Sequence, residues 1–295
     1  MMVCLDLTDI DPSLIEYASF LSQTLETDKV IFFHAIQAYD LPDKSSKKFP
    51  DLQSSLSNTI QEEINSVVSS HFKRRTKTEV ITKIEDEDAA NVINDFIEKE
   101  EVDLALIGQK YGEDREGRYG QKIAASAKAD LLFVPENPSL SVNHILNVLD
   151  LSKESEKAFI RTRDIAQVTG AEITCYYIYD TSKSYFPAST HETSSAFQKQ
   201  FQKKFRKYLK KFDLTPKDVY GEFEVNDELK SQAEKLYNKA ERMQADLIII
   251  GAKGQTSSFT SLLGNVSENL RRMEKEIPVM IMKNRKKKGA GLLPF

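Results

Sequence analysis

A chain of 295 residues with 40% hydrophobic and 29% charged residues has the composition of a globular protein with room for two domains. Its 41 basic and 45 acidic residues give a formal net charge of −4, so no overall positive field favours nucleic acid as a partner. Two cysteines, Cys4 and Cys175, are too few for a disulfide scaffold. The N-terminal stretch lacks the pattern of a signal peptide, and no apolar run reaches the roughly 20 residues of an integral membrane segment. We therefore expect a cytoplasmic protein.

Strands and helices alternate along the first half of the chain. Short apolar runs predict buried strands, and apolar residues at helical spacing predict the helices between them. The predicted strands are Met2–Leu5, Lys29–Ile36, Glu79–Ile84, Val102–Ile107 and Leu131–Val134, with helices beginning at Pro12, running through Leu56–Val68 and covering Ala89–Glu100.

The second half repeats this plan. Asp6 and Asp150 each end a first strand and are 144 residues apart, and Gly108 and Gly251 each end a fourth strand and are 143 residues apart. An internal duplication of about 145 residues explains both shifts. The predicted strands of this half are Ile145–Leu149, Glu172–Tyr179, Val219–Val225, Asp246–Ile250 and Val279–Met282, with helices through Ala158, Ile165 and Val168 to Gly170, over Ser194–Phe212 and over Leu229–Met243.

Strands separated by helices of ten or more residues need crossover connections, which produce a parallel sheet with helices on both faces. The sequence therefore predicts an α/β protein made of two tandem copies of a five-stranded parallel-sheet domain. We place the N-terminal copy at residues 1–140, the C-terminal copy at 141–285 and a basic and apolar tail at 286–295. Such sheets bind ligands outside the carboxyl ends of their strands, which is where Asp150 and Gly251 lie.

The stretch GAKGQTSSFTSLLGNVSENL, which begins at Gly251, is a candidate phosphate-binding loop. Gly251 and Gly254 allow the backbone to approach a ligand closely. Gly264 precedes a predicted helix, whose free N–H groups and positive dipole end favour an anion. Asn265 and Ser267 add donors, and Lys253 adds a positive charge. The alternative is an ordinary strand-to-helix connection.

The spacing Gly251-x2-Gly254-x9-Gly264-Asn265 resembles the nucleotide loop of the universal stress protein family, G-x2-G-x9-G-(S/T). ILNVLDLSKESEKAF resembles the first strand of that family, whose terminal aspartate contacts the nucleotide, and ADLIIIGAKG and IPVMIMK resemble the strand before the loop and the closing strand. The resemblance covers the whole chain as a tandem pair. It implies a Rossmann-like fold of the adenine nucleotide alpha hydrolase type. It also implies an adenine-nucleotide-binding, stress-responsive protein, dimeric or paired within one chain.

The resemblance implies that the C-terminal copy binds ATP or another adenine nucleotide, with Mg as a companion ion. Asn265 replaces the Ser/Thr of the family, although its amide still donates. In the N-terminal copy, Tyr111 takes the place of the second glycine and acidic residues follow it, so we expect a degenerate loop there. The expected nucleotide-binding residues are Asp150, Gly251, Lys253, Gly254, Gly264, Asn265, Val266 and Ser267.

Three functions remain open. The first is a stress-response switch or regulator controlled by the bound nucleotide, and the second is a nucleotide-free scaffold or interaction module of the same fold. An enzyme is the weakest candidate, because the chain has no G-x-x-x-x-G-K-(S/T) loop and no G-x-S-x-G elbow, so we expect at most slow ATP hydrolysis. The four histidines lack the spacing of a metal site. A lipid or metabolite in the same cleft is a further alternative.

Three other features suggest contacts. The segment Phe197–Phe212 has phenylalanines on one face and lysines on the other, which indicates a helix covering the sheet or, alternatively, one on an anionic membrane or in a partner groove. The closing strands Leu131–Val134 and Val279–Met282 are expected at sheet edges, where they would pair within one chain or between two chains. The tail after Arg285 is either solvated or docked on a neighbour. No particular protein partner is indicated.

Overall fold

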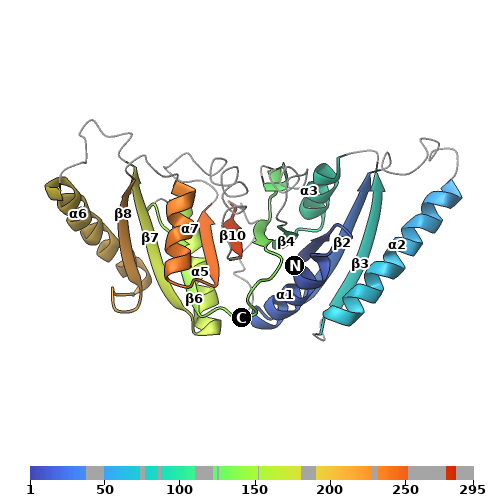
Figure 1. The fold of residues 1–295 in the computed structure, drawn as a ribbon, viewed down its shortest axis with the longest axis horizontal. Coiled ribbons are helices and arrows are strands. Elements are labelled where there is room, and N and C mark those ends of the chain that lie inside the picture. Colours follow the sequence, from blue (N-terminus) through green and yellow to red (C-terminus); the bar gives the residue numbers. More distant parts are fainter. Residues whose placement is uncertain are drawn as a thin grey trace. The chain divides into compact units, whose positions relative to one another are not determined.

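The computed structural model describes residues 1–37, 50–73, 77–85, 88–109, 122–124, 126–151, 153–180, 191–226, 232–251 and 277–283. Contacts between Cα atoms divide the chain into two compact units, with Met1–Leu140 in the first and Ser141–Met282 forming the second. Each unit is an α/β domain in which helices alternate with strands (Figure 1).

The first unit contains a five-stranded sheet in the order β3-β2-β1-β4-β5, and every pair in that order is parallel. Met2 of β1 faces Ile31 of β2 on one side and Ala105 of β4 on the other. The elements are β1 (Met2–Leu5), α1 (Asp11–Thr24), β2 (Lys29–Gln37), α2 (Pro50–His71), β3 (Lys77–Glu85), α3 (Ala89–Lys99), β4 (Leu104–Gly108) and β5 (Asp130–Val134).

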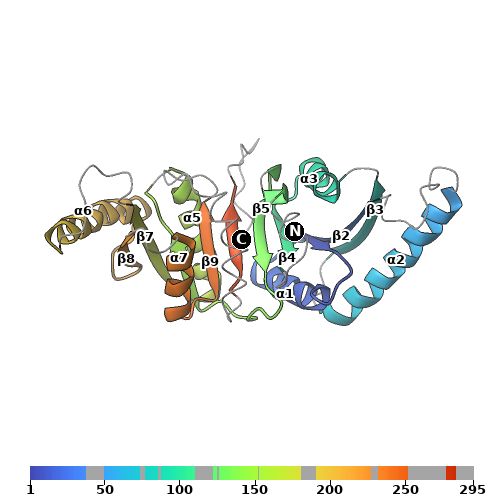
Figure 2. The ribbon, with the colours of Figure 1, turned by 45° about the horizontal axis from the view of Figure 1, so that its top comes forward.

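The second unit repeats this topology with the order β10-β9-β6-β7-β8, again with parallel pairs (Figure 2). The predicted fold class is therefore confirmed, with element bounds that differ from the expected ones by a few residues. The elements are β6 (His144–Val148), α5 (Lys153–Thr169), β7 (Glu172–Asp180), α6 (His191–Leu209), the 3-10 helix η3 (Lys210–Phe212), β8 (Tyr220–Asn226), α7 (Gln232–Arg242), β9 (Leu247–Gly251) and β10 (Val279–Met282).

The duplication extends to the backbone conformation. Three pairs of residues with a positive φ angle, which L side chains rarely adopt, recur at nearly the same shift as the strand ends. Because each such residue follows a strand or a helix, the two units turn their chain in the same way at the same places. The pairs are Leu7 and Leu151 (62° and 60°), Glu26 and Gly170 (46° and 77°), and Glu101 and Gln244 (48° and 53°).

Helices cover both faces of each sheet, as successive strand residues show. In β2 the ring of Phe32 contacts Phe72, just after α2, whereas the ring of the next residue, Phe33, contacts Phe96 of α3. Side chains of adjacent strand residues point to opposite faces, so α2 and α3 lie on opposite sides of this sheet. None of the helices in the described ranges is both long and apolar enough to cross a membrane.

The helix α6 covers the sheet of the second unit with its aromatic face. Phe201 and Phe205 are 4% and 0% exposed, and the ring of Phe201 stacks on Tyr177 of β7 with centroids 5.3 Å apart. The helix therefore acts as a sheet-covering crossover, which was the first of its expected roles. One expected inward residue of α5 differs: Val168 is 44% exposed. At about 100° per residue, it lies off the line through Ala158 and Ile165.

Gly221 of β8 lets α6 approach the sheet closely. A Cβ atom at this position would lie 2.5 Å from Cδ1 of Phe205 and would overlap Cε1 of the same ring. The ring cannot easily move, because it is fully buried and its centroid lies 5.4 Å from that of Phe201. The absence of a side chain at Gly221 is therefore a packing requirement.

We predict that Gly221→Ala lowers the free energy of unfolding by about 1–3 kcal/mol, the usual cost of overpacking a core. Urea denaturation followed by circular dichroism measures this loss. In the double variant Gly221→Ala/Phe205→Leu the two losses should be less than additive, because the smaller side chain makes room for the new methyl group. Strict additivity would show that the Phe205 ring is not the cause.

Candidate functional site

The carboxyl ends of β6 and β9 are adjacent at the point where the strand order of the second unit reverses. From β6 the chain proceeds to β7 and β8 on one side and returns to β9 on the other. Val148 of β6 is paired in register with Ile250 of β9. Asp150 follows Val148 by two residues and Gly251 follows Ile250 by one. Reversal points of this kind are where parallel α/β sheets bind ligands.

A tight loop holds Asp150 beside β7. The N–H of Leu149 donates to the carbonyl oxygen of Tyr176 at 2.9 Å, and Leu151 adopts the left-handed conformation with φ of 60°. Asp150 itself is half-buried. Burial, followed by the charges of Tyr179 and Asp150, raises the pKa of Tyr177 on β7. A carboxylate at this position can accept hydrogen bonds from the hydroxyl or amino groups of a ligand.

The ring of Tyr177 is not an open stacking platform for a ligand. Its ring stacks on Phe201 of α6 at 5.3 Å and on Phe223 of β8 at 6.0 Å, so neighbouring rings already pack against it. Of the eight predicted nucleotide-binding residues, the structure brings together Asp150 and Gly251. The other six lie outside the described residues: Lys253, Gly254, Gly264, Asn265, Val266 and Ser267.

A buried polar contact ties β6 to α5 beneath Asp150. The Nδ2 of Asn147 donates to the hydroxyl of Thr162 at 2.8 Å, and that hydroxyl donates to the carbonyl oxygen of Ala158 at 2.8 Å. Asn147 and Thr162 are both fully buried, so losing this bond would leave a polar group without a partner in the core. Our sequence reasoning missed this pair, although an asparagine inside the apolar run ILNVL was a visible signal. The hydrogen bond between Asn147 and Thr162 holds the end of β6 that leads into Asp150.

In the first unit, the loop after β1 corresponds to the loop that carries Asp150, and a carboxylate of the same chain accepts hydrogen bonds from its N–H groups. The side chain of Asp11, at the start of α1, accepts hydrogen bonds from the N–H of Leu7 at 2.8 Å and of Asp6 at 3.3 Å. Asp11 is 5% exposed, and the hydroxyl of Thr8 donates to Asp6. The N–H groups of the strand-end loop are therefore satisfied internally, and a negative charge is buried beside them. The sequence analysis did not single out Asp11, since an aspartate in the first turn of a helix is common.

The second unit differs at this point. Ser155, 144 residues after Asp11, is 3% exposed and uncharged, and its carbonyl oxygen accepts a hydrogen bond from Tyr208 of α6 at 3.3 Å. No buried negative charge thus stands at this position of the second loop. The acidic and tyrosine residues that we expected to impair the loop of the first copy, from Tyr111 to Glu116, lie outside the described residues.

Another cluster of ionisable side chains lies on the face of the second sheet that packs against α7, opposite to the face that α6 covers. The hydroxyl of Tyr176 donates to Glu224 at 2.5 Å, and the ammonium group of Lys235 lies 3.3 Å from Glu224 and donates to the carbonyl oxygen of Val225 at 2.8 Å. Burial and Glu224 raise the pKa of Tyr176. Because its groups satisfy one another, the cluster fastens α7 to β7 and β8. Across the described ranges, no three His, Cys, Asp or Glu side chains gather as a metal site requires.

We predict that Asp11→Asn destabilises the first unit by about 1–2 kcal/mol, because the amide keeps one acceptor oxygen where the carboxylate uses two. Thermal unfolding of the two proteins measures the difference. The matched control is Asp9→Asn, which changes the same charge two residues away. An equal effect of both substitutions would contradict a specific role of Asp11.

The comparisons with known proteins agree with the observed fold. The model of the Universal stress protein family matches residues 141–283, and a search of curated proteins finds no match. A universal stress protein from Archaeoglobus fulgidus is 17% identical, with a TM-score of 0.69 over 96% of this chain and 97% of its own. A functionally unknown protein from Pseudomonas aeruginosa is 13% identical, with a TM-score of 0.62 over 96% of this chain and 92% of its own.

A shorter universal stress protein, solved in complex with cAMP, is 16% identical and matches 46% of this chain and 94% of its own with a TM-score of 0.34. The first two likenesses extend the shared fold over nearly the whole chain, and the family match identifies the second unit. Residues 141–283 therefore form a domain of the universal stress protein family.

Proposed function

We propose that the second unit binds ATP or a related adenine nucleotide, with Mg as a companion ion, and that the chain acts in the cytoplasm as a stress-response switch or regulator. The observation that carries this proposal is the meeting of Asp150 and Gly251 at the adjacent carboxyl ends of β6 and β9. A carboxylate there can accept from the hydroxyl groups of a ribose. A glycine next to it lets the backbone approach phosphates.

The difference between the two loops supports the second unit as the binding copy. In the first unit, the buried Asp11 carboxylate already accepts from the N–H groups of Asp6 and Leu7. A nucleotide phosphate brought to this loop would meet a like charge and no free donors from these two residues. In the second unit the residue at the same position is the neutral Ser155, so this repulsion is absent.

Lys253, Gly254, Gly264, Asn265, Val266 and Ser267 would complete the site by holding the phosphates. We propose binding with at most slow hydrolysis, because a switch needs only that the bound and free states differ in shape. A nucleotide-free scaffold of the same fold is the second candidate. The observation that favours it is Asn265, which stands where the family loop has Ser or Thr.

We predict that freshly purified protein releases ATP or ADP when it is denatured, and that calorimetry with ATP, ADP and cAMP gives a measurable affinity for at least one of them. Asp150→Ala should weaken that affinity roughly 10- to 100-fold, the effect of losing one or two hydrogen bonds to a charged group. Gly251→Val should weaken it further, because its side chain would occupy the space of the phosphates.

The matched controls are Asp6→Ala and Gly108→Val, which make the same changes at the equivalent positions of the first unit. They should leave the affinity unchanged. The reverse result, with loss only in the controls, would assign binding to the first unit. If no nucleotide is released and calorimetry stays silent with all three ligands, the scaffold becomes the better account.

We also propose self-association through the closing strands. β5 and β10 each end the strand order of their own unit, and both consist mainly of buried apolar residues. The expected outcome for a homodimer is a light-scattering mass that rises from one chain to two as the concentration increases. A mass of one chain at every concentration would exclude the homodimer and leave pairing within the chain.

A further inference from the structure

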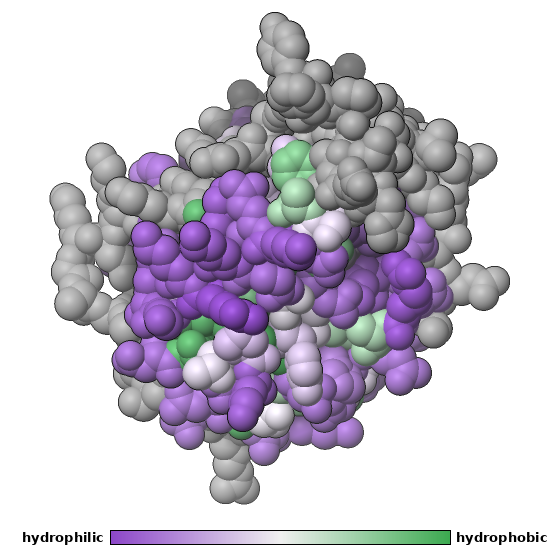
Figure 3. Space-filling view, turned by 90° about the vertical axis from the view of Figure 1, so that its left-hand side faces the viewer, coloured by the Kyte–Doolittle hydropathy of each residue, from purple (hydrophilic) through white to green (hydrophobic). Residues whose placement is uncertain are grey.

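The outer face of α6 carries a strip of positive charge that neither the fold nor the proposed nucleotide site uses. Figure 3 views the molecule from the side on which α6 lies in Figure 1, and its described surface is mainly hydrophilic. We call the following five residues the basic strip, all of them exposed: Lys199, Lys203, Arg206, Lys207 and Lys210. No aspartate or glutamate occurs between Ser195 and Phe212.

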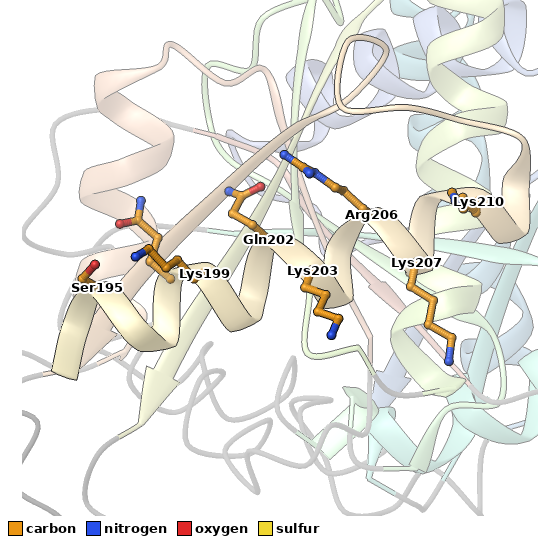
Figure 4. Close-up of a pocket in the computed structure, with 8 residues that line it drawn as sticks. Ser195, Lys199, Gln202, Lys203, Arg206, Lys207 and Lys210 are labelled. Atoms are coloured by element: carbon orange, nitrogen blue, oxygen red, sulfur yellow. The ribbon is translucent and has the colours of Figure 1, made fainter. Parts of the chain in front are cut away.

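The basic strip lines an open groove of about 650 Å³ together with Ser195, Gln198 and Gln202. In Figure 4 the side chains of Lys203 and Lys207 extend in the same direction from the helix, one turn apart. The strip covers about 17 Å along the helix axis, at 1.5 Å per residue. It is thus a continuous cationic surface over α6 and the adjoining η3, to which Lys210 belongs.

None of the five cations forms an ion pair with a carboxylate among the described residues. Other lysines of the second unit do: the adjacent Lys211 pairs with Glu156, and Lys239 of α7 pairs with Glu222. The strip therefore keeps an uncompensated charge whose members repel one another along the helix. An external polyanion would relieve this repulsion.

The equivalent helix of the first unit shows that the sheet does not need this charge. α2 covers β3 in the first unit as α6 covers β8 in the second. Between Ser57 and His71, however, α2 has no lysine or arginine, and its exposed positions include Glu62 and Glu63. Since the same structural task is performed with an acidic outer face, the fold itself does not require the basic strip.

The chemistry of the basic strip limits the class of partner that it can bind. Cores of protein interfaces are depleted in lysine and depend on aromatic anchors, and single-stranded nucleic acids are held by stacking on exposed aromatic rings. The large aromatic side chains of α6 face inward instead: Phe201, Phe205 and Tyr208 are all less than 5% exposed. The half-buried Phe197 stacks on Tyr179 of β7. The exposed side chains of the basic strip are four lysines and one arginine, with polar amides beside them. An anionic lipid surface requires no anchor, only several cations within a Debye length of the headgroups.

We propose that the basic strip binds the anionic phospholipid headgroups of a membrane surface. α6 would lie along the surface without inserting, because its apolar face is already committed to its own sheet. The attraction is electrostatic throughout, so it depends on the negative lipid content and on salt. This association does not rest on nucleotide binding.

The test is sedimentation of the full chain with vesicles of phosphatidylcholine alone or of an equimolar mixture with phosphatidylserine. We expect binding only to the mixture at about 0.1 M salt and its loss near 1 M salt, where the Debye length shrinks to roughly 3 Å. The variant Lys199→Gln/Lys203→Gln/Lys207→Gln should partition about a hundredfold less, at about 1 kcal/mol for each lysine removed.

The control variant is Lys73→Gln/Lys99→Gln/Lys217→Gln, which removes three exposed charges outside α6 and should bind like the unmodified protein. Thermal unfolding of both variants checks that they fold. Equal binding to both vesicle types, or equal losses in both variants, would overturn the proposal. So would tighter binding to duplex DNA or to polyglutamate than to the mixed vesicles, since the strip would then belong to nucleic acid or to an acidic protein.

Discussion

The parallel pairing of β6 with β9 is the constraint on which the candidate site depends. The central residues of β6 and all but the last residue of β9 are buried, so their register is fixed by the packing of apolar side chains on both faces of the sheet. Once Val148 lies beside Ile250, Asp150 and Gly251 must emerge at the same edge. The hydrogen bond between Asn147 and Thr162 then holds α5 against β6 and limits where the loop carrying Asp150 can go.

The two units show how one backbone plan can carry different chemistry. Their strand orders match, and their left-handed residues recur at matching positions, so the polypeptide follows the same path twice. The polar groups attached to that path differ. Where the first unit has the apolar Val3, the second has the buried Asn147, and where the first has the carboxylate of Asp11, the second has Ser155. The frame of the fold is therefore separable from the groups that would receive a ligand.

One face of α6 packs on the sheet, and the opposite face is exposed and basic. Phe205 packs so closely on Gly221 that the strand has no room for a side chain there, whereas the lysines on the other side of the same helix have no ion-pair partners among the described residues. This division follows from the helical period, which places aromatic residues every three or four positions toward the sheet and leaves the intervening positions to solvent.

The features that arise from local patterns could be predicted from the sequence. Apolar runs and helical spacing located the strands and helices, the shift between Asp6 and Asp150 revealed the duplication, and strand ends followed by Asp150 and Gly251 indicated the edge of the sheet that matters. The six loop residues from Lys253 to Ser267 remain predictions, because they lie outside the described residues. The contacts between distant segments could be seen only in the folded chain: the hydrogen bond of Tyr176 to Glu224, 48 residues apart, and the approach of Phe205 to Gly221. The same holds for the Asp11 carboxylate, which accepts hydrogen bonds from the N–H groups of its own loop. No local period encodes such contacts, because they depend on how two elements pack and on which polar groups that packing buries.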